Sequence, residues 1–202
     1  MSTLLSLFPL DDVLLPDAVL PLHIFEPRYK EMIGECLERN QAFGVIRSKE
    51  QELADIGCMA KIMSVTKKYD DGRMDIVTEG GDRFEVMQLN QERSFLRGEV
   101  MYFHDEAGSA TPAQIAQAVK LHGEIVKLAG AEAQMPAELD PKQLSFRLAG
   151  SLPLDLDFKQ TLLAMKSEAE RLPAVIEFLE AVLPTMRRAV VVRNKARGNG
   201  HV

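Results

Sequence analysis

The sequence is poor in the residues that build metal and redox sites, with two cysteines, four histidines and no tryptophan among 202 residues. Cys36 and Cys58 have no CxxC partner and no neighbouring histidine, so we expect two buried thiols rather than metal ligands or a disulfide. Unpaired thiols are typical of a reducing compartment. The chain also lacks a signal peptide and an apolar run of about 20 residues, the length that a membrane span needs. We therefore expect a cytoplasmic protein without membrane association.

The charge balance lacks an excess of basic residues. The chain has 24 Lys and Arg residues against 30 Asp and Glu residues, which gives a net charge of −6. A negative field repels phosphate backbones, and this argues against general nucleic-acid binding. With 46% hydrophobic and 27% charged residues, the composition is that of a globular protein with one core or two small ones.

Motifs of known enzyme classes are missing as well. The sequence contains no phosphate-binding loop, no dinucleotide-binding glycine motif, no nucleophile elbow and no HExxH zinc motif. Adjacent carboxylates such as Asp70 and Asp71 lie in predicted turns, where turn chemistry accounts for them. His122 lies at the edge of an apolar helical stripe and is interpreted as a packing residue. The sequence therefore predicts no catalytic residue, no metal and no cofactor, and we expect a protein that is not an enzyme.

The first forty residues predict two strands followed by a helix. Leu4–Leu10 and Val19–Phe25 are apolar segments that each contain one proline. Because proline donates no ladder hydrogen bond, these segments are expected to be edge or barrel-rim strands. Pro27 favours a first helical turn, and apolar residues recur after it with helical spacing through Leu37.

The middle of the chain predicts further strands. A short strand over residues 42–47 is expected to lead through a polar connector to a hairpin over residues 58–79. Asp71 and Gly72 are expected to form the tight turn of this hairpin, since both of its central positions need a positive φ. Residues 79–82 (EGGD) predict another break, after which strand patterning continues to Phe103.

The patterning changes at His104, where a small polar stretch is followed by segments with helical period. Thr111, Pro112 and Gln114 predict a capping box with proline in the first turn, and Gly130 is expected to end that helix. Later helices are expected to start near Pro141, Asp157 and Ser167. We therefore expect a β-rich subdomain over residues 1–104, a helical subdomain over residues 111–193 and a flexible tail over residues 194–202.

Three segments, in this order along the chain, resemble motifs of one family. They read LFPLDDVLLPDAVLPLHIFEPRYKEMIGECL, IGCMAKIMSVTKKYDDGRMDIVTEGGDRFEV and FRLAGSLPLDLDFKQTLLAM. On these residues the chain resembles, from Leu7 to about Leu183, the Lon N-terminal domain family. This substrate-binding module stands at the front of ATP-dependent Lon proteases and also occurs in a free-standing bacterial form. Since no ATPase or Ser/Lys protease module follows within these residues, the free-standing form is the expectation.

The resemblance implies an α+β fold: a PUA-like twisted pseudo-barrel of β-strands with one inserted helix, followed by a small helical subdomain. It also implies a non-catalytic module that binds unfolded or degron-bearing polypeptide in a groove between barrel and helices, with a separate protease as a candidate partner. Proline-bearing edge strands are suited to accept an extended peptide. The sequence gives no indication of an oligomeric state.

Two other functions remain as alternatives. RNA binding is one, because PUA-like barrels elsewhere bind RNA; the basic cluster from Arg187 to Arg197 supports it and the net charge of −6 argues against it. A hydrolase of unrecognised type is the other, and the lack of an activated nucleophile argues against it. Salt-dependent nucleic-acid binding would separate the RNA hypothesis from peptide recognition.

Candidate peptide-binding or rim residues lie mainly where the second predicted strand passes into the helix: His23, Phe25, Arg28, Tyr29 and Arg83. Leu22, Ile24 and Phe25 are expected to pack into the barrel. For Arg28 we favour a structural role, in which a buried guanidinium ties the helix to the barrel through Glu26 or a later carboxylate. The alternative is that Arg28 and Tyr29 contact peptide at the rim of the groove.

Overall fold

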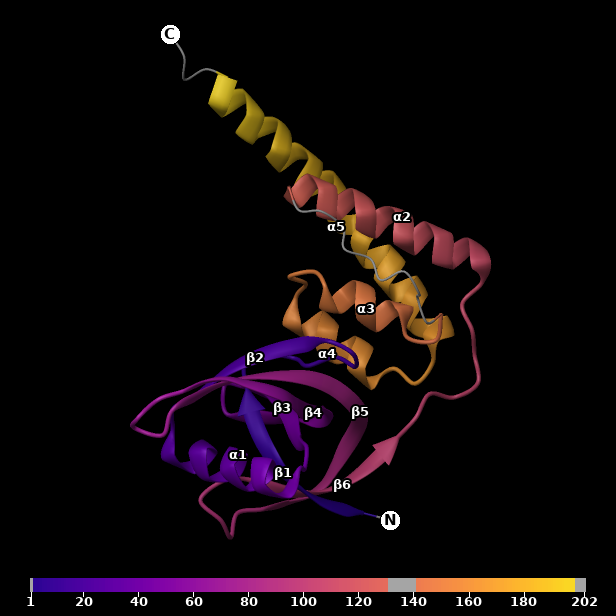
Figure 1. Ribbon diagram of the computed structural model, residues 1–202. Helices are drawn as coiled ribbons and strands as arrows, with labels where there is room; N and C mark the ends of the chain where they lie inside the picture. The colour runs from indigo at the N-terminus through magenta and orange to yellow at the C-terminus, as the bar shows by residue number, and fades with distance from the viewer. Residues whose placement is uncertain (1, 131–140, 199–202) are drawn as a thin grey trace. The chain divides into compact units, whose positions relative to one another are not determined.

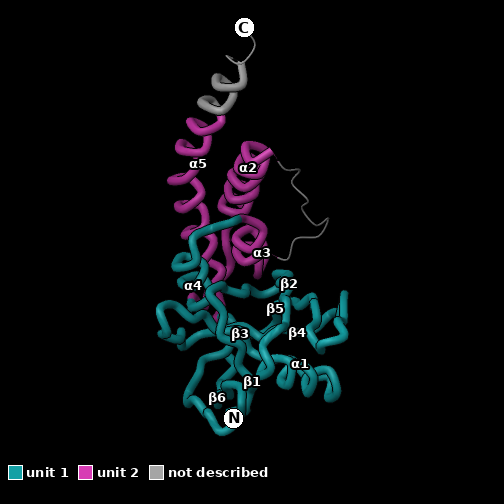
Figure 2. Tube along the Cα trace, turned by 90° about the vertical axis from the view of Figure 1, so that its left-hand side faces the viewer, with its two compact units in different colours: residues 1–105, 153–164 teal, residues 106–152, 165–202 magenta. Residues whose placement is uncertain are grey.

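The computed structural model describes residues 2–130 and 141–198, and the chain divides into two compact units (Figures 1 and 2). Unit 1 comprises residues 1–105 and 153–164, and unit 2 comprises residues 106–152 and 165–202. The described part of unit 1 contains strands and two helices: β1 (Thr3–Leu10), β2 (Val19–Ile24), α1 (Pro27–Arg39), β3 (Phe43–Lys49), β4 (Glu52–Lys68), β5 (Met74–Asn90), β6 (Arg97–Phe103) and α4 (Leu156–Ala164).

The strands of unit 1 form a mixed sheet with the order β2-β5-β4-β3-β1-β6, and a further pairing between β5 and β6 closes it into a pseudo-barrel. Strand β5 makes the closure possible because it is 17 residues long. One of its sides pairs with β4, while the other side pairs first with β2 over residues 74–79 and then with β6 over residues 83–90. Helix α1 is inserted between β2 and β3. The expected α+β pseudo-barrel with one inserted helix is therefore confirmed.

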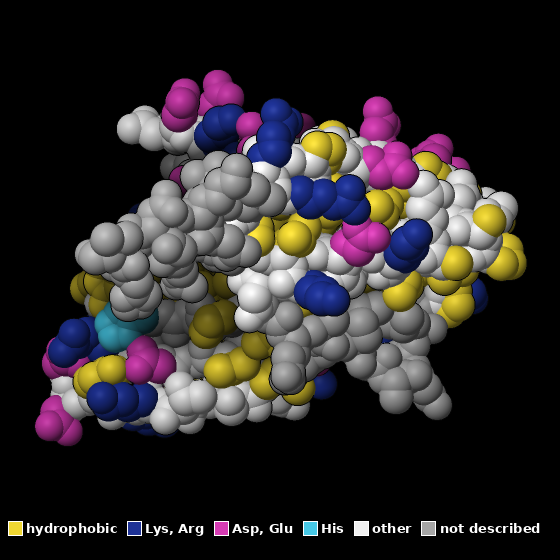
Figure 3. All heavy atoms as spheres, turned by 90° about the horizontal axis from the view of Figure 1, so that it is seen from above, with side chains coloured by type: hydrophobic (Ala, Val, Ile, Leu, Met, Phe, Trp, Pro, Cys, Tyr) yellow, Lys and Arg dark blue, Asp and Glu magenta, His cyan; other side chains and the backbone are white. Residues whose placement is uncertain are grey.

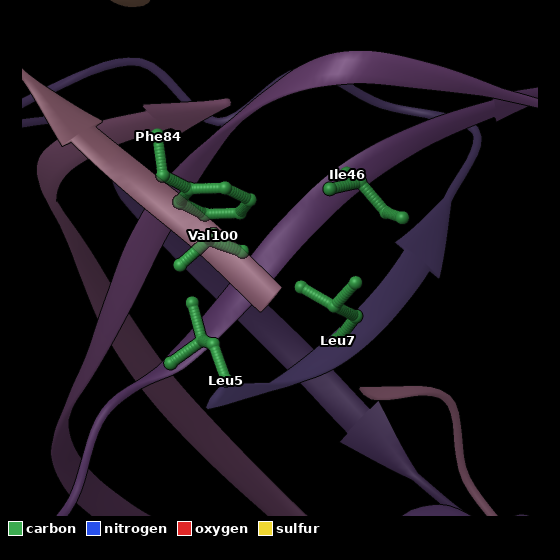
Figure 4. Packing of buried hydrophobic residues seen from close by; sticks show 5 residues of the cluster. All are labelled: Leu5, Leu7, Ile46, Phe84 and Val100. Carbon is green, nitrogen blue, oxygen red and sulfur yellow. The ribbon is translucent and has the colours of Figure 1, made fainter. Parts of the chain in front are cut away.

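The core of the barrel is built from alternate residues of its strands. Leu5, Leu7, Ile46, Phe84 and Val100 are buried and point toward one another (Figure 4). Two glycines on neighbouring strands, Gly44 and Gly57, make room for the Phe84 ring. A Cβ atom at either position would lie 2.6 Å from Phe84 Cζ, which is closer than packed atoms approach. These glycines are therefore needed for close packing.

The hairpin of β4 and β5 differs from its expected form in two respects. Its turn runs from Tyr69 to Arg73, and only Gly72 in it has a positive φ, of 80°. Asp71 instead accepts hydrogen bonds from the backbone and side chain of Arg73. The expected break at residues 79–82 is wrong, because β5 continues through them, with a bulge where β4 shifts register.

The polar connector expected before residue 58 is also wrong. Residues Phe43–Lys49 and Glu52–Lys68 are strands β3 and β4, joined by a two-residue turn at Glu50 and Gln51. Both turn residues have a positive φ, of 50° and 72°. Two-residue hairpins favour this conformation because it matches the twist of the strands, but glycine and asparagine usually occupy it. The sequence therefore gave no local signal for this turn.

Unit 2 is helical in its described part, with α2 (Pro112–Ala129), α3 (Leu144–Gly150) and α5 (Glu168–Gly198). The capping box of Thr111 and Gln114 is confirmed, and Gly130 caps the other end of α2 with a φ of 79°. A buried polar cluster joins α3 to α5. Glu168 accepts hydrogen bonds from the backbone and hydroxyl of Ser145, and Arg171 pairs with Glu168 at 3.0 Å while its guanidinium lies 4.2 Å from the Phe146 ring centroid.

The boundaries in the second half differ from those that the sequence predicts. Residues 153–164, which include α4, group with the barrel rather than with the helical unit. Asp155, not Asp157, caps α4, because its carboxylate accepts a hydrogen bond from the Phe158 backbone. The helix predicted to open at Pro141 and Gln143 is α3, which begins at Leu144 directly after Gln143; Asp140, the other residue of that predicted start, lies with residues 131–139 outside the described residues. Helix α5 continues to Gly198, within the expected flexible tail, and residues 199–202 lie outside the described part.

Candidate functional site

Strand β2 lies at the end of the sheet order, and β5 is its only pairing partner in the described part of the chain. The buried side chains of Leu22 and Ile24 face the core, so the alternate residues of the strand face outward. Four outward residues, which we call the β2 face, therefore border an open strand edge: Val19, Pro21, His23 and Phe25. Val19 is 66% exposed and Phe25 is 58% exposed, which is high for large apolar side chains.

The expectation that Phe25 packs into the barrel is wrong, whereas it is confirmed for Leu22 and Ile24. Consecutive residues of an extended chain point to opposite sides, so Ile24 and Phe25 cannot both face the core. The Phe25 ring instead stacks on His23, with ring centroids 5.9 Å apart and planes inclined by 21°. These two candidate residues therefore lie together on the outer surface.

His23 belongs to a hydrogen-bonded group that joins β2 to the β4–β5 hairpin. Its Nδ1 lies 2.5 Å from Oδ1 of Asp75, the residue opposite it on β5. The hydroxyl of Tyr69 donates to the other carboxylate oxygen of Asp75 at 2.9 Å. These hydrogen bonds, first from His23 and then from Tyr69, lower the pKa of Asp75, so the carboxylate stays ionised at neutral pH. Because Nδ1 contacts Asp75, Nε2 is the ring nitrogen of His23 that is left for another partner.

Tyr69 extends the β2 face to the tip of the hairpin. Its ring meets the edge of the His23 ring at a centroid distance of 5.8 Å. Two cations lie over the Tyr69 ring, with Lys67 Nζ at 4.5 Å and Arg73 Cζ at 5.0 Å from its centroid. The surface beside β2 therefore combines apolar side chains, an ionised carboxylate and cations held against an aromatic ring.

Arg28 and Tyr29 lie on the first turn of α1, just past the β2 face. Arg28 pairs with Glu26 at 2.8 Å, as the structural role predicts, but its side chain is 51% exposed, so the expectation of a buried tie to the barrel is wrong. Tyr29 is buried and stacks on Phe8 with a centroid distance of 4.2 Å. Burial also raises the pKa of the Tyr29 hydroxyl. Of these two candidates, Arg28 is therefore the one open to a ligand.

Arg83 lies apart from the other candidates, on the segment of β5 that pairs with β6. It is buried, donates to the main-chain oxygen of Leu163 at 2.9 Å and pairs with the Asp105 carboxylate. Its guanidinium also lies 4.6 Å from the centroid of the Phe103 ring. These contacts are those of a residue that holds the fold of unit 1 together.

Sequence reasoning did not identify Tyr69 and Asp75, which complete the group around His23. The turn motif at Gly72 places these two residues on facing strands of one hairpin. The pairing of that hairpin with β2 joins residues 52 positions apart, between His23 and Asp75, and has no local signal. The site could therefore be found only once the sheet order was known.

Both cysteines are buried free thiols, as the sequence predicts. Burial raises the pKa of Cys36 to about 11 and that of Cys58 to about 12, so both stay protonated and unreactive at neutral pH. In the described part of the chain, no group of three or more His, Cys, Asp or Glu residues could hold a metal ion. No helix there is long and apolar enough to cross a membrane.

The basic cluster near the end of the chain is described only in part. Arg187 pairs with Glu124 at 2.7 Å, and Arg188 donates to the carbonyl of Pro184. The side chains of Arg193, Lys195 and Arg197 lie outside the described residues. On the face drawn in Figure 3, charged side chains of both signs alternate with hydrophobic ones.

The fold is similar to solved structures of Lon N-terminal domains, and the architecture is the PUA-like pseudo-barrel with a following helical region. The crystal structure of a Lon N-terminal domain protein from Xanthomonas campestris matches with a TM-score of 0.70 and 27% identity, covering 87% of this chain and 98% of that one. The N-terminal domain of a Mycobacterium avium complex Lon protease has the same fold, with a TM-score of 0.68 and 20% identity over 88% of this chain and 98% of that one.

Residues 5–181 match the family described as the ATP-dependent protease La (LON) substrate-binding domain. The chain belongs to this family. Among curated relatives, it is 22% identical to Lon protease 1 of Hydrogenovibrio crunogenus over 93% of this chain, and 26% identical to Lon protease 2 of Myxococcus xanthus over 87% of this chain. The chain spans about a quarter of the length of these relatives, 25% and 23% respectively.

Proposed function

We propose that this chain recognises polypeptide and that β2 receives an extended segment as an additional strand. The observation that carries the proposal is the open edge of β2, together with the exposed side chains of Val19 and Phe25 beside it. An extended peptide can use main-chain hydrogen bonds along such an edge, while its alternate side chains contact the neighbouring surface. The membership of a substrate-binding domain family supports a polypeptide as the ligand.

The chemistry of the β2 face favours unfolded segments with mixed apolar and polar residues. Phe25 and Val19 can contact apolar side chains of the peptide, and Nε2 of His23 can form a hydrogen bond. Pro21 offers no main-chain donor, so the added strand forms fewer hydrogen bonds than it would on a complete edge. The affinity of such an interface depends little on the sequence of the peptide, which suits a protein that binds many unfolded segments.

We infer further that these 202 residues catalyse no reaction themselves and that they present bound polypeptide to an ATP-dependent protease. The curated relatives named Lon protease support this role, because the matching region is only about a quarter of their length. The two buried thiols support action in the cytoplasm, where unpaired cysteines persist.

The experiment is a binding titration of a fluorescent, N-acetylated and C-terminally amidated peptide of alternating apolar and polar residues. Phe25→Ser should weaken binding about tenfold, a loss of about 1.4 kcal/mol of binding free energy. Met87→Ser is the matched control, because Met87 is 56% exposed on β5 and Phe25 is 58% exposed. Equal affinities of the two variants would refute a role for the β2 face.

A second peptide tests strand addition itself. The same sequence N-methylated at alternate residues keeps its side chains but loses the main-chain donors along one edge. It should bind about tenfold more weakly than the parent peptide if main-chain hydrogen bonds carry the affinity. Binding that is unaffected by N-methylation at either set of alternate positions would exclude strand addition.

A further inference from the structure

A hollow in unit 1 lies apart from the β2 face, bordered by the start of β1, the end of α1 and the start of β6. Its volume is about 310 Å³, which is in the range of small-ligand sites. Its lining includes three arginines but only one carboxylate. We call it the arginine hollow and define it by Arg39, Arg93, Arg97 and Glu35.

The cations of the arginine hollow outnumber the carboxylates that contact them. Arg93 pairs with Glu35 and, at 2.8 Å, with Glu31. The other oxygen of Glu35 lies 3.8 Å from Arg39, a long contact. The side chain of Arg97 makes no hydrogen bond or ion pair with any described residue, although its backbone pairs with β1 and β5. Three guanidinium groups thus face two carboxylates, and one positive charge is left over.

The excess positive charge lies on Arg97, which is partly shielded from solvent. Its side chain is half-buried at the wall of the hollow. A guanidinium has five N–H donors in a planar fork, and at this site no described protein group accepts from them. The fork matches the two oxygens of a carboxylate better than it matches a single acceptor.

Other lining groups define what else a ligand would contact. Ser6 and Tyr102 line the hollow, and the hydroxyl of neither forms a hydrogen bond with a described residue. Burial raises the pKa of Tyr102, which keeps its hydroxyl protonated and able to donate at neutral pH. Leu5, Ala42 and Phe95 supply apolar wall. The lining therefore combines a cationic fork and hydroxyl donors with an apolar surface.

We propose that the arginine hollow binds an organic carboxylate with a short apolar group, with Arg97 pairing with the carboxylate and Phe95 and Ala42 contacting the apolar group. Two sources share this chemistry: the last residue of a polypeptide with a free C-terminus and a small free acid. The polypeptide source rests on the proposed function, because in that case the hollow and the β2 face would contact the same polypeptide.

The test is a pair of titrations of the full chain by calorimetry, with N-acetyl-leucine and with N-acetyl-leucinamide. These ligands differ only in the carboxylate. The acid should bind at least about tenfold more tightly than the amide, and Arg97→Gln should remove most of this difference. Arg187→Gln is the control, since Arg187 pairs with Glu124 in the helical unit and should not affect binding of the acid. Equal binding of acid and amide, or unchanged binding by Arg97→Gln, would overturn the proposal.

Chemical-shift mapping on the unmodified chain provides a readout that does not depend on the folding of a variant. The acid should shift the amide signals of Ala42, Arg97 and Tyr102, and shifts confined to other residues would contradict the site. Tighter binding of inorganic phosphate than of the acid would overturn the assignment of the ligand class.

A tripeptide ending in leucine, N-acetylated and with a free carboxylate, identifies the source. Tighter binding of the tripeptide than of N-acetyl-leucine assigns the hollow to polypeptide C-termini, and equal binding assigns it to small acids; both support the site. The peptide used for the β2 face is amidated, so Arg97→Gln should leave its affinity unchanged. Failure of one proposal is therefore distinguishable from failure of the other.

Discussion

Arg83 donates a hydrogen bond from its Nη1 to the main-chain oxygen of Leu163 at 2.9 Å, across a sequence separation of 80 residues. The bond links barrel strand β5 to α4, which lies far along the chain. A second bond acts in the same way, since Gln160 Nε2 donates to the Ile56 carbonyl at 2.9 Å. In the first turn of α4, Asp157 pairs with two residues of β3, Arg47 at 2.5 Å and Lys49 at 3.0 Å. Helix α4 is therefore part of the barrel unit through specific polar contacts.

Arg83→Met should destabilise the protein strongly, because it removes the hydrogen bond to the Leu163 carbonyl and the ion pair with the Asp105 carboxylate. Removing one partner of a buried pair costs about 3 to 5 kcal/mol, and we expect the lower end because Asp105 is 29% exposed and can be hydrated. Urea unfolding measures the free energy of unfolding. Arg28→Met is the control and should cost no more than about 1 kcal/mol, because the Arg28–Glu26 pair is exposed. Similar losses for both variants would contradict this account of Arg83.

The sequence predicted the features that depend on neighbouring residues. Pro27 at the start of α1, the capping box of Thr111 and Gln114, and the glycine turn at Gly72 act over a few residues, and each occurs in the structure. The closure of the barrel and the place of α4 depend on contacts across tens of residues, such as that of Arg83. Periodicity carries no information on these contacts, and the resemblance to the family was needed to expect the barrel.

The candidate site followed the same division. His23 and Arg28 were found because they flank a recognisable strand-to-helix junction. The residues around them could not be predicted in this way. The exposure of Phe25, for example, depends on which side of β2 faces the core. The role of Asp75 likewise depends on the β2–β5 register.

The turn between β3 and β4 should become more stable when glycine occupies its second position. Gln51 has a φ of 72°, a conformation that costs non-glycine residues free energy. Gln51→Gly should therefore raise the free energy of unfolding by about 0.5 to 1 kcal/mol. Gln91→Gly is the control: Gln91 is exposed in a loop and has no positive φ, so glycine there should be neutral or destabilising. A loss of stability in Gln51→Gly would contradict the turn conformation.

Acid should destabilise the protein through His122. Its side chain is buried with Nε2 2.7 Å from the Ser151 hydroxyl, and burial lowers its pKa below 6.5. The unfolded state then binds more protons than the folded state as the pH falls through about 6.5, so the stabilisation present above this pH is lost below it.

The measurement is urea unfolding at pH 7.5 and pH 5.5 for the wild type, His122→Gln and His104→Gln. His122→Gln should lose less stability on acidification than the wild type, because it has no buried group to protonate. His104→Gln serves as the control, because His104 is exposed and its replacement removes a histidine without changing the buried site at His122. A pH dependence that is the same in all three proteins would rule out His122 as the cause.

Hydrogen–deuterium exchange tests the peptide-binding proposal most directly, because strand addition must protect the free amides of the edge that receives the peptide. The full chain is measured alone and with a saturating concentration of the N-acetylated, amidated peptide. We predict slower exchange in residues 19–24, with no change in the turn at residues 48–53. Unchanged exchange in residues 19–24, with protection appearing elsewhere, would contradict the assignment of β2 as the peptide-binding strand.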